Sequence, residues 1–353
     1  GIAVGSNGAA FLTLNGTDWG TVSGTVPVAA TYMADTYSPG TNTDVTTFVG
    51  NPASFTTNTL RFNAGGGGTL TLTGTNVLAA GGILIGSGSG AVTIDGTGTL
   101  AGSAVAGTVA APINGELGIF QHSASALTIS AAIVNSGMSF IAATAAGTTL
   151  NKHGTGTLIL SSTGNAWTGG TNIANGILRL GAANVLPNGI GTATSGNVTI
   201  ATAGTLDLNG FSEIINGLAG SGVVDSLAAG SMTLTIGDSN AAQTFTGVIR
   251  NTAGTLSLAK IGTGIQTLSG ANTYSGSTTI ARGTLLLNFT TAGAPLSNIL
   301  PSTLLTLGSG TLNVTGSTVA NSQTFSGVTL AGGGIITAAG TTPNITLNLG
   351  TIT

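Results

Sequence analysis

Residues able to do acid–base or metal chemistry are few and far apart in this sequence. Nine acidic side chains and two histidines are spread over 353 residues, and the chain has no cysteine. Enzymes that cleave polysaccharides need clustered carboxylates, with a basic group or a bound cation close by. The closest regular acidic pair is Asp207 and Glu213, with Asp207 on the outer face of an alternating run and Glu213 beyond a turn. We therefore predict that this pair is a solvated surface feature rather than a catalytic one.

The histidines and the glycine-rich stretches match no ligand-binding pattern. His122 and His153 have no partner histidine at the spacing of a metal site. Residues 65–68 and 86–90 are rich in glycine, but neither stretch opens a helix or is followed by the Lys-Ser/Thr of a nucleotide site. We predict that both stretches form turns of the chain between strands. We therefore predict no catalytic, metal-binding or cofactor-binding residue, no cofactor and no enzymatic activity.

The charge pattern argues against nucleic acid as a partner. Only 4% of the residues are charged, whereas about 25% is usual for a globular domain. The formal net charge is −3 and the six cations are scattered, so no face gathers the cations that phosphate binding requires. No apolar run reaches the roughly 18 residues of a membrane-spanning helix, so we expect no membrane span.

The secondary structure of the chain is predicted to consist of short β-strands. Leu, Ile or Val alternate with Thr, Ser or Asn, which is typical of strands with one buried face. Glycine-marked corners follow promptly, and helical periodicity is absent. The clearest of these alternating runs lie at 69–72, 157–160, 205–208, 233–236, 255–258, 284–287, 311–314 and 346–349.

Three observations favour a parallel β-helix over a sandwich or an antiparallel barrel. Most of these strands recur at intervals of a few tens of residues, which is the mark of a repeat architecture. Hairpin turns do not join the strands pairwise throughout. The chain also lacks the charges that protect the edges of sandwiches, and interior strands of a β-helix do not need them because each is paired on both sides.

Two segments of the chain, residues 152–180 and 260–287, repeat one pattern. Each reads Lys-x-Gly-x-Gly, an alternating strand, Asn-x-aromatic-Ser/Thr-Gly, and then Thr-x-Ile-x-x-Gly-x-Leu-x-Leu. This pattern resembles the passenger-associated transport repeat, also called the autotransporter-associated β-strand repeat. The first copy has one inserted residue, and Trp167 stands where Tyr is usual. The motif residues are Gly154, Gly156, Leu158, Asn165, Trp167, Gly169, Thr171, Ile173, Gly176 and Leu178 in the first copy, and Gly262, Gly264, Leu268, Asn272, Tyr274, Gly276, Thr278, Ile280, Gly283 and Leu285 in the second.

The resemblance covers roughly residues 59 to 353 and implies an all-β, right-handed parallel β-helix at the cell surface or outside the cell. It implies structural or adhesive roles and no active site. We expect the shared residues to turn, stack and pack the chain, and Lys152 and Lys260 to be exposed charges at strand edges. Trp167 and Tyr274 are expected to pack over coil corners, and the alternative is that they stack on sugars. The chain is predicted to be a fragment, a processed passenger or a subunit exported in another way.

The predicted organisation is an N-terminal segment, 1–55, followed by β-solenoid repeats over 56–353. The first segment, rich in aromatic residues, is either a cap on the first coil or a contact segment for another copy. The repeats divide into 56–151, 152–259 and 260–353.

The predicted function is that of a structural subunit of an extracellular fibre, sheath or surface layer. Its partners would be copies of itself, joined end to end or by strand exchange, because open solenoid ends present unpaired backbone groups. The alternative is an adhesin or autotransporter passenger that binds glycans or host surfaces. A carbohydrate-active enzyme is the third candidate, and it would need an acidic groove that the sequence does not supply.

Overall fold

The computed structural model describes residues 12–23, 26–48, 53–103, 115–135, 147–188, 195–340 and 345–353. These residues form strands joined by short turns, and no helix occurs among them. None of the described elements is therefore a helix long and apolar enough to cross a membrane. The chain divides into two compact units, residues 1–185 and 186–353.

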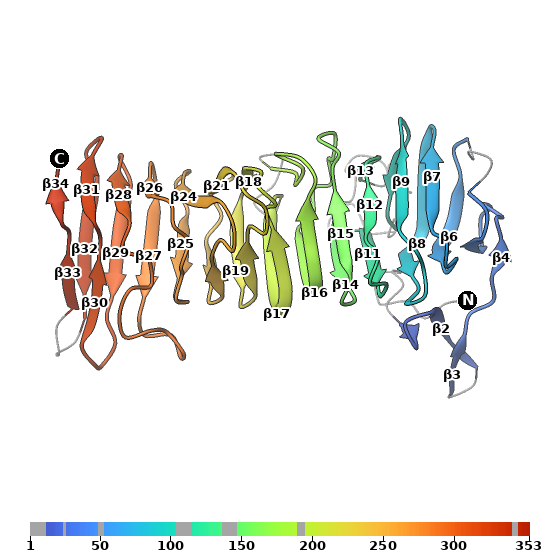
Figure 1. The fold of residues 1–353 in the computed structure, drawn as a ribbon, viewed down its shortest axis with the longest axis horizontal. Helices are drawn as coiled ribbons and strands as arrows, with labels where there is room; N and C mark the ends of the chain where they lie inside the picture. Colours follow the sequence, from blue (N-terminus) through green and yellow to red (C-terminus); the bar gives the residue numbers. More distant parts are fainter. Residues whose placement is uncertain are drawn as a thin grey trace, which may run out of the picture. The chain divides into compact units, whose positions relative to one another are not determined.

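The first unit begins with an antiparallel sheet, in which β2 pairs with both β1 and β3. Every later pairing between strands of this unit is parallel (Figure 1). Its strands are β1 (Thr13–Leu14), β2 (Asp18–Ser23), β3 (Val26–Ala29), β4 (Met33–Ala34), β5 (Asn42–Val45), β6 (Thr56–Phe62), β7 (Gly68–Leu72), β8 (Thr75–Ile85), β9 (Val92–Gly96), β10 (Thr99–Ala101), β11 (Gly115–Gln121), β12 (Leu127–Ile129), β13 (Ala132–Val134), β14 (Thr148–His153), β15 (Thr157–Leu160) and β16 (Thr171–Leu180).

Three parallel ladders run through the first unit. One joins β4, β5, β6, β8, β11, β14 and β16. A second joins β7, β9, β12, β15 and the end of β16, and a third joins the start of β8 to β10 and β13. The chain visits the three ladders in turn and then returns to the first, which is the winding of a parallel β-helix.

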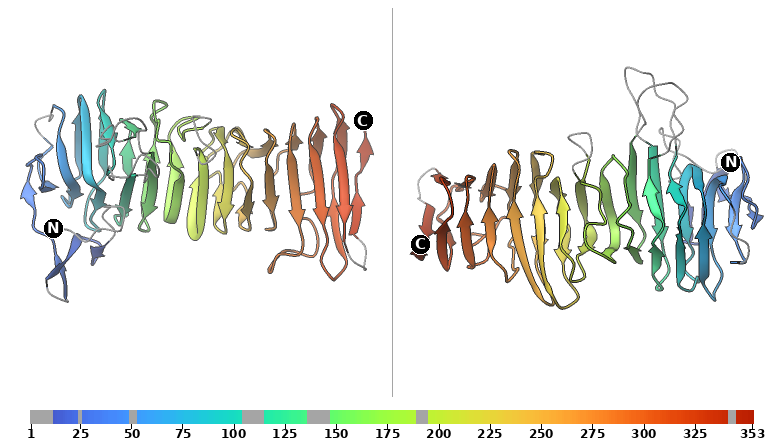
Figure 2. Two further views of the ribbon diagram at one scale, coloured as in Figure 1. Left: turned by 180° about the vertical axis from the view of Figure 1, so that it is seen from behind. Right: turned by 90° about the horizontal axis from the view of Figure 1, so that it is seen from above.

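The second unit contains only parallel pairs among its described strands. One ladder joins β18, β21, β24, β26, β28, β31 and β34. Another joins β17, β19, β22, β25, β27, β29 and β32, and shorter ladders join β17, β20 and β23, and β30 and β33. The views in Figure 2 agree that strands of one unit lie side by side. The strands are β17 (Asn197–Asp207), β18 (Glu213–Ile215), β19 (Gly217–Gly220), β20 (Val223–Asp225), β21 (Ser231–Ile236), β22 (Gln243–Phe245), β23 (Val248–Ile249), β24 (Thr255–Lys260), β25 (Ile265–Leu268), β26 (Thr278–Ile280), β27 (Thr284–Asn288), β28 (Leu304–Leu307), β29 (Thr311–Thr315), β30 (Asn321–Thr324), β31 (Gly327–Leu330), β32 (Ile335–Ala339), β33 (Ile345–Asn348) and β34 (Thr351–Ile352).

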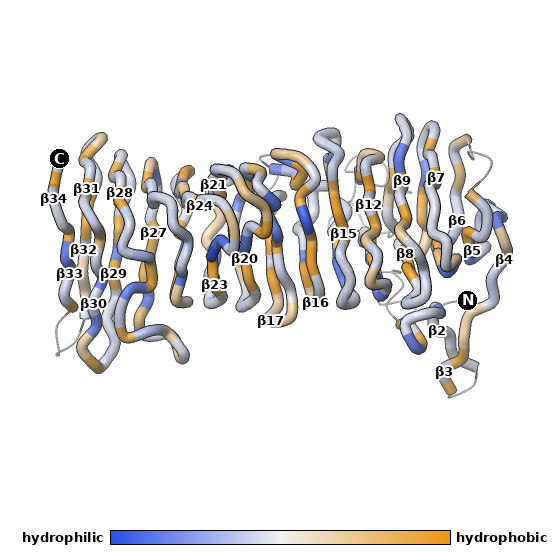
Figure 3. The backbone as a smooth tube through the Cα atoms, viewed as in Figure 1, coloured by the Kyte–Doolittle hydropathy of each residue, from blue (hydrophilic) through white to orange (hydrophobic). Residues whose placement is uncertain are grey.

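The core of each unit is built from the inward residues of the alternating strands. In β21, for example, Met232, Leu234 and Ile236 are buried, while the threonines between them are partly exposed. Because the parallel strands pair in register, side chains of the same kind lie next to each other in successive coils. Leu234, for example, lies beside Leu258 of the next coil. Apolar residues recur along the strands in Figure 3, and strongly hydrophilic ones are sparse. Burial of these aliphatic side chains is the main stabilising term, since each contributes about 1.5–3 kcal/mol.

The predicted all-β parallel β-helix is confirmed. Within the predicted N-terminal segment, the antiparallel strands end at Ala29 and parallel pairing begins with β4 and β5. Residues 1–11, 24–25 and 49–52 of that segment lie outside the described residues. The boundaries at 55, 151 and 259 stay predictions.

Candidate functional site

The two motif copies occupy equivalent places, one in each unit. In the first copy β14 pairs with β16, which sets Leu150 beside Thr171. In the second, β24 pairs with β26 and sets Leu258 beside Thr278. Each motif therefore starts on one coil and ends on the next.

The first glycine of the motif lets the chain turn a corner in contact with the coil before it. Gly154 and Gly262 have φ angles of 77° and 61°, a region that side-chain-bearing residues rarely adopt. A β-carbon on Gly262 would lie 1.9 Å from the carbonyl oxygen of Gly237. Only glycine fits this turn and this approach together.

The glycine near the end of the motif stacks on the corner where the same motif began. A β-carbon on Gly283 would lie 2.4 Å from the oxygen of Gly262 and 2.6 Å from that of Gly264. In the first copy, a β-carbon on Gly176 would lie 2.5 Å and 2.7 Å from the oxygens of Gly154 and Gly156. The spacing of the glycines is thus the length of one coil.

A second glycine corner lies after the aromatic residue. The amide of Gly169 donates a hydrogen bond of 2.9 Å to the carbonyl oxygen of Thr148, and the amide of Gly276 donates one of 2.8 Å to that of Leu256. A β-carbon at either glycine would lie 2.4 Å from that same oxygen. Both corners therefore press directly on the preceding coil.

The motif asparagine joins three coils through its amide group. Asn272 is buried, accepts a hydrogen bond of 2.8 Å from the amide of Ile249 and donates one of 2.8 Å to the carbonyl of Ile299. Asn165 does the same between Ile133 and Val185, at 2.8 and 2.9 Å. Ile133 and Ile249 lie in β13 and β23, the last described strands of their ladders. The asparagine therefore gives their amides the acceptor that a further strand would supply, and burial without an acceptor would be costly.

The motif aromatic residue is a packed corner residue with one polar contact. Trp167 and Tyr274 are each 1% exposed. The Trp167 indole Nε1 donates to the Thr171 hydroxyl at 3.3 Å, and the Tyr274 and Thr278 hydroxyls are hydrogen-bonded at 2.6 Å. Burial raises the pKa of Tyr274 well above its usual range, although the bond to Thr278 opposes this shift. Packing is therefore the role of both rings, and neither is accessible to a sugar.

The expectation that the motif lysines are exposed charges is wrong. Lys152 and Lys260 are 0% and 1% exposed. The Lys152 ammonium donates to the carbonyl oxygens of His153, Gly154 and Asn175, at 2.9, 2.7 and 3.0 Å. It thereby holds together corners of two successive coils.

The second lysine makes the same kind of contact with backbone carbonyl groups. Lys260 donates to the carbonyl oxygens of Ile261 and, at 3.4 Å, Gly262. Burial lowers the pKa of Lys152 to about 7 and that of Lys260 to about 8. The alternating pattern of β24 indicates this burial, because Lys260 lies on the same inward face as Leu256 and Leu258.

The remaining motif residues are core. Ile173 and Ile280 are fully buried beside the two lysines of the preceding coil. Leu158, Leu178, Leu268 and Leu285 are at most 1% exposed. The sequence analysis missed Gln266, which is 1% exposed and lies beside Leu285. Its amide both accepts from the Leu218 amide at 3.1 Å and donates to the Leu218 carbonyl at 2.8 Å.

The acidic pair is not a solvated surface feature, because Asp207 and Glu213 are both fully buried. Asp207 accepts hydrogen bonds from the amides of Asn209 and Leu227, at 2.9 and 3.0 Å. Its neighbour in register, Asp225, pairs with Arg250 at 2.7 Å. These carboxylates therefore fix turns of the backbone. Within the described ranges, no group of three or more His, Cys, Asp or Glu could hold a metal ion.

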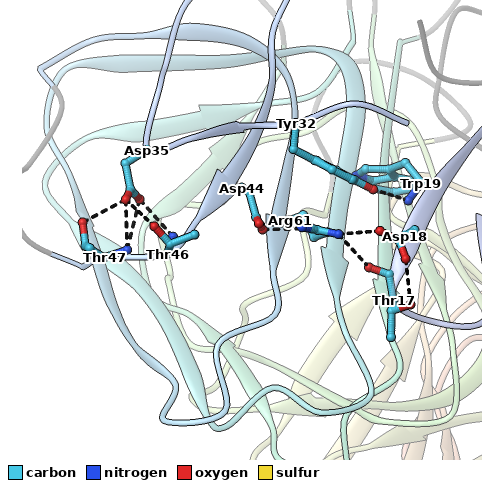
Figure 4. A network of polar contacts seen from close by, with 9 residues as sticks. All are labelled: Thr17, Asp18, Trp19, Tyr32, Asp35, Asp44, Thr46, Thr47 and Arg61. Atoms are coloured by element: carbon cyan, nitrogen blue, oxygen red, sulfur yellow. Dashed lines mark hydrogen bonds and ion pairs between the residues drawn. The ribbon is translucent and has the colours of Figure 1, made fainter. Parts of the chain in front are cut away.

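A second polar network, which the sequence analysis also missed, joins the N-terminal segment to β6 (Figure 4). The Arg61 guanidinium pairs with Asp18 and Asp44, each at 2.5 Å. Arg61 also stacks over the Tyr32 ring at 3.6 Å, and the Tyr32 hydroxyl accepts from the Trp19 amide at 2.5 Å. This network ties the antiparallel sheet to β5 and β6, so it is a structural feature of the first unit.

The coils are stacked, and the repeated residues form their corners, their core and the hydrogen bonds between them. This arrangement defines a β-helical repeat protein. The family model of the passenger-associated transport repeat matches residues 150–180 and 258–287, the two segments just described. The chain is a passenger-associated transport repeat protein.

A curated relative supports this assignment over most of the chain. The chain is 34% identical over 281 residues to the adhesin BmaC autotransporter of Brucella suis biovar 1 (strain 1330), a match that covers 78% of the chain. The chain spans about 7% of the length of that protein. No solved structure matches the chain significantly. The predicted location, outside the cell or on its surface, is confirmed by the family and by this relative.

Proposed function

We propose that this chain is a passenger segment of a bacterial surface adhesin, and that its β-helix presents surfaces for glycans or host cells. The observation that carries the proposal is the continuous similarity to an autotransporter adhesin over 78% of the chain. It favours the adhesin, our alternative from the sequence, over the structural fibre that we predicted first.

The geometry of the motif supports this assignment. Its conspicuous side chains are buried and hydrogen-bonded within the coils, so the surface left for recognition is the outward rows of Thr, Ser and Asn. One shallow cavity of about 440 Å³ lies over such a row and is lined by Thr244, Thr267, Ile265 and Leu286. Hydroxyl groups beside apolar side chains suit contact with sugars and polar surfaces. We infer no enzymatic activity for this chain.

The test is retention of beads coated with the whole chain on host-cell monolayers and on glycan arrays. We expect coated beads to be retained more strongly than albumin-coated beads, and heat-denatured coating to abolish the difference. The variant Thr244→Glu, which places a charge on an exposed position of the cavity lining, should weaken retention if this row makes the contact, whereas Thr306→Glu on the ladder that contains β28 is its control. Equal retention of native and albumin beads on every surface would contradict the proposal.

Self-association is a second candidate, favoured by strand β3. Its residues Val26 and Val28 are 58% and 37% exposed, and among described strands β3 pairs only with β2. An apolar edge strand is a template for another strand. Sedimentation at rising concentration tests this candidate: copies joined through β3 should dissociate in Val26→Lys/Val28→Lys, and a monomer at every concentration would exclude it.

A further inference from the structure

The N-terminal strands of the first unit lie as a strap over the outer face of its coils. The strap comprises residues 12–23 and 26–34. Its side chain Trp19 is fully buried in a cluster with Ala30, Leu84 and Phe120, and Tyr32 packs against this cluster. The strap is therefore a docked cover rather than a free end.

Beneath the strap, outward residues of successive coils form a row. Leu84 of β8 lies beside Phe120 of β11, which lies beside His153 of β14. Trp19 meets Phe120 edge-on with the ring centroids 5.2 Å apart, and Phe120 stacks on His153 at 4.5 Å with an angle of 16° between the rings. Such arrangements are favourable aromatic contacts. The histidine thus supports the aromatic ring on which the strap rests.

The tip of the strap lies on the other histidine of the chain. A β-carbon on Gly16, at the turn between β1 and β2, would lie 3.3 Å from Cγ of His122. The Gly16 carbonyl also accepts from the Ser87 amide at 3.2 Å. Nε2 of His122 is buried and has no hydrogen-bond partner among the described residues. A proton on that nitrogen would create a buried charged donor without an acceptor, which is strongly unfavourable.

The charged groups around the two histidines favour their neutral forms. Burial lowers the pKa of His122 below 6.5, and the positive charge of Lys152 lowers it further. The pKa of His153 is lowered by burial, then by Lys152 and His122. The other charged side chains at this place are Asp18 of the strap and Asp44 and Arg61 of the coils, and Arg61 pairs with both carboxylates.

We propose that the strap is a pH-sensitive cover, held down while His122 and His153 are neutral and released when they take up protons. In the released state the imidazoles are solvated and bind protons at their ordinary value near 6.5. The docked state binds fewer protons, so docking is strongest above about pH 7 and weakens as the pH falls below about 6.5. Release exposes the apolar row of Leu84 and Phe120. This inference does not depend on the adhesin assignment.

Fluorescence of Trp19 in the full chain tests the proposal. The chain has two tryptophans, and the substitution Trp167→Tyr leaves Trp19 as the sole one while giving the first motif copy the residue of the second. On titration from about pH 7.5 to about pH 5, above the range where carboxyl groups mostly titrate, we expect the emission to shift to longer wavelength. The far-ultraviolet circular dichroism should stay unchanged.

The matched variant adds His122→Leu and His153→Phe, which removes both histidines of the chain and keeps a ring on Phe120. Its emission should not move over the same range. In parallel, amide exchange of the unsubstituted chain should rise in residues 13–34 on acidification, after correction for the intrinsic pH dependence. Unchanged emission and exchange down to about pH 5, or the same emission shift without the histidines, would overturn the proposal.

Discussion

At the scale of single residues, the polar members of the repeat are structural because they are buried and hydrogen-bonded. Asn272, Tyr274 and Lys260 each use side-chain donors or acceptors on corners or on a neighbouring motif residue. Removing one partner of a buried hydrogen bond costs about 1–3 kcal/mol, more than the bond itself contributes. The polar residues of the motif therefore hold the winding in register.

Substitution of Lys152 and Lys260 by Met should remove part of the pH dependence of stability. In the folded chain their pKa values fall to about 7 and about 8, whereas the unfolded amines keep the ordinary 10.5. The unfolded chain then binds more protons between these values, so the free energy of unfolding rises with pH from about 7 to about 10. Urea midpoints at about pH 7 and about pH 9 measure this slope. The double Met variant should show a smaller rise, and an identical rise would contradict the buried position of the ammonium groups.

The substitution Tyr274→Phe should lower the free energy of unfolding by about 1 kcal/mol, because it leaves the buried Thr278 hydroxyl without its partner. Tyr37→Phe is the matched control, since the Tyr37 hydroxyl has no hydrogen bond among the described residues and its ring still packs on Phe55 at 4.9 Å. Urea denaturation at neutral pH compares the two. Equal midpoints for both variants would show that the hydroxyl contact is not formed.

The sequence did not predict where every charge lies. The alternation that buries Leu256 and Leu258 also places Lys260 on the inward face. Lysine side chains are rarely buried, however, and we therefore expected this one to be exposed. Asp207 stands between the inward residues Leu206 and Leu208, and its buried carboxylate accepts a hydrogen bond from the amide of Leu227, twenty positions further along the chain. Burial of this kind depends on a segment that is distant in sequence, so the local pattern of residues does not predict it.

At the scale of elements, strands and corners follow from two simple signals. Alternation places one face of each strand in the core, and glycine marks positions where a coil presses on its neighbour. Both signals are local, so the strands and the parallel β-helix could be predicted. The docking of the strap, residues 12–23 and 26–34, could not be predicted, since it depends on Trp19 meeting Phe120, about a hundred positions further along the chain.

The substitution Gly262→Ala should destabilise the second unit by at least about 2 kcal/mol, because it combines an unfavourable φ with a β-carbon 1.9 Å from the Gly237 oxygen. Gly333→Ala is the control, because a β-carbon there meets no atom within 4 Å. Thermal unfolding followed by circular dichroism measures both. A corner that tolerates Ala at 262 as well as at 333 would be inconsistent with the close approach of coils described here.

At the scale of the whole molecule, the chain behaves as two units that each carry one copy of the repeat. In repeat proteins stability is close to a sum of terms between neighbours, so damage at one corner stays local. The family and the similarity to an adhesin autotransporter assign this architecture to the cell surface or the outside of the cell. The central claim is that the repeated motif joins successive coils.

Amide hydrogen exchange over the whole chain, compared between the unsubstituted protein and Asn272→Ala, tests this claim most directly. Asn272 accepts from the amide of Ile249 and donates to the carbonyl of Ile299, so the variant should lose protection around residues 249, 272 and 299. In Asn272→Ala the first unit should keep its protection. Asn313→Ala is the control, because the side chain of Asn313 is on the outward face of β29, and the whole chain should keep its protection in this variant. Unchanged protection around Ile249 in Asn272→Ala would contradict the account.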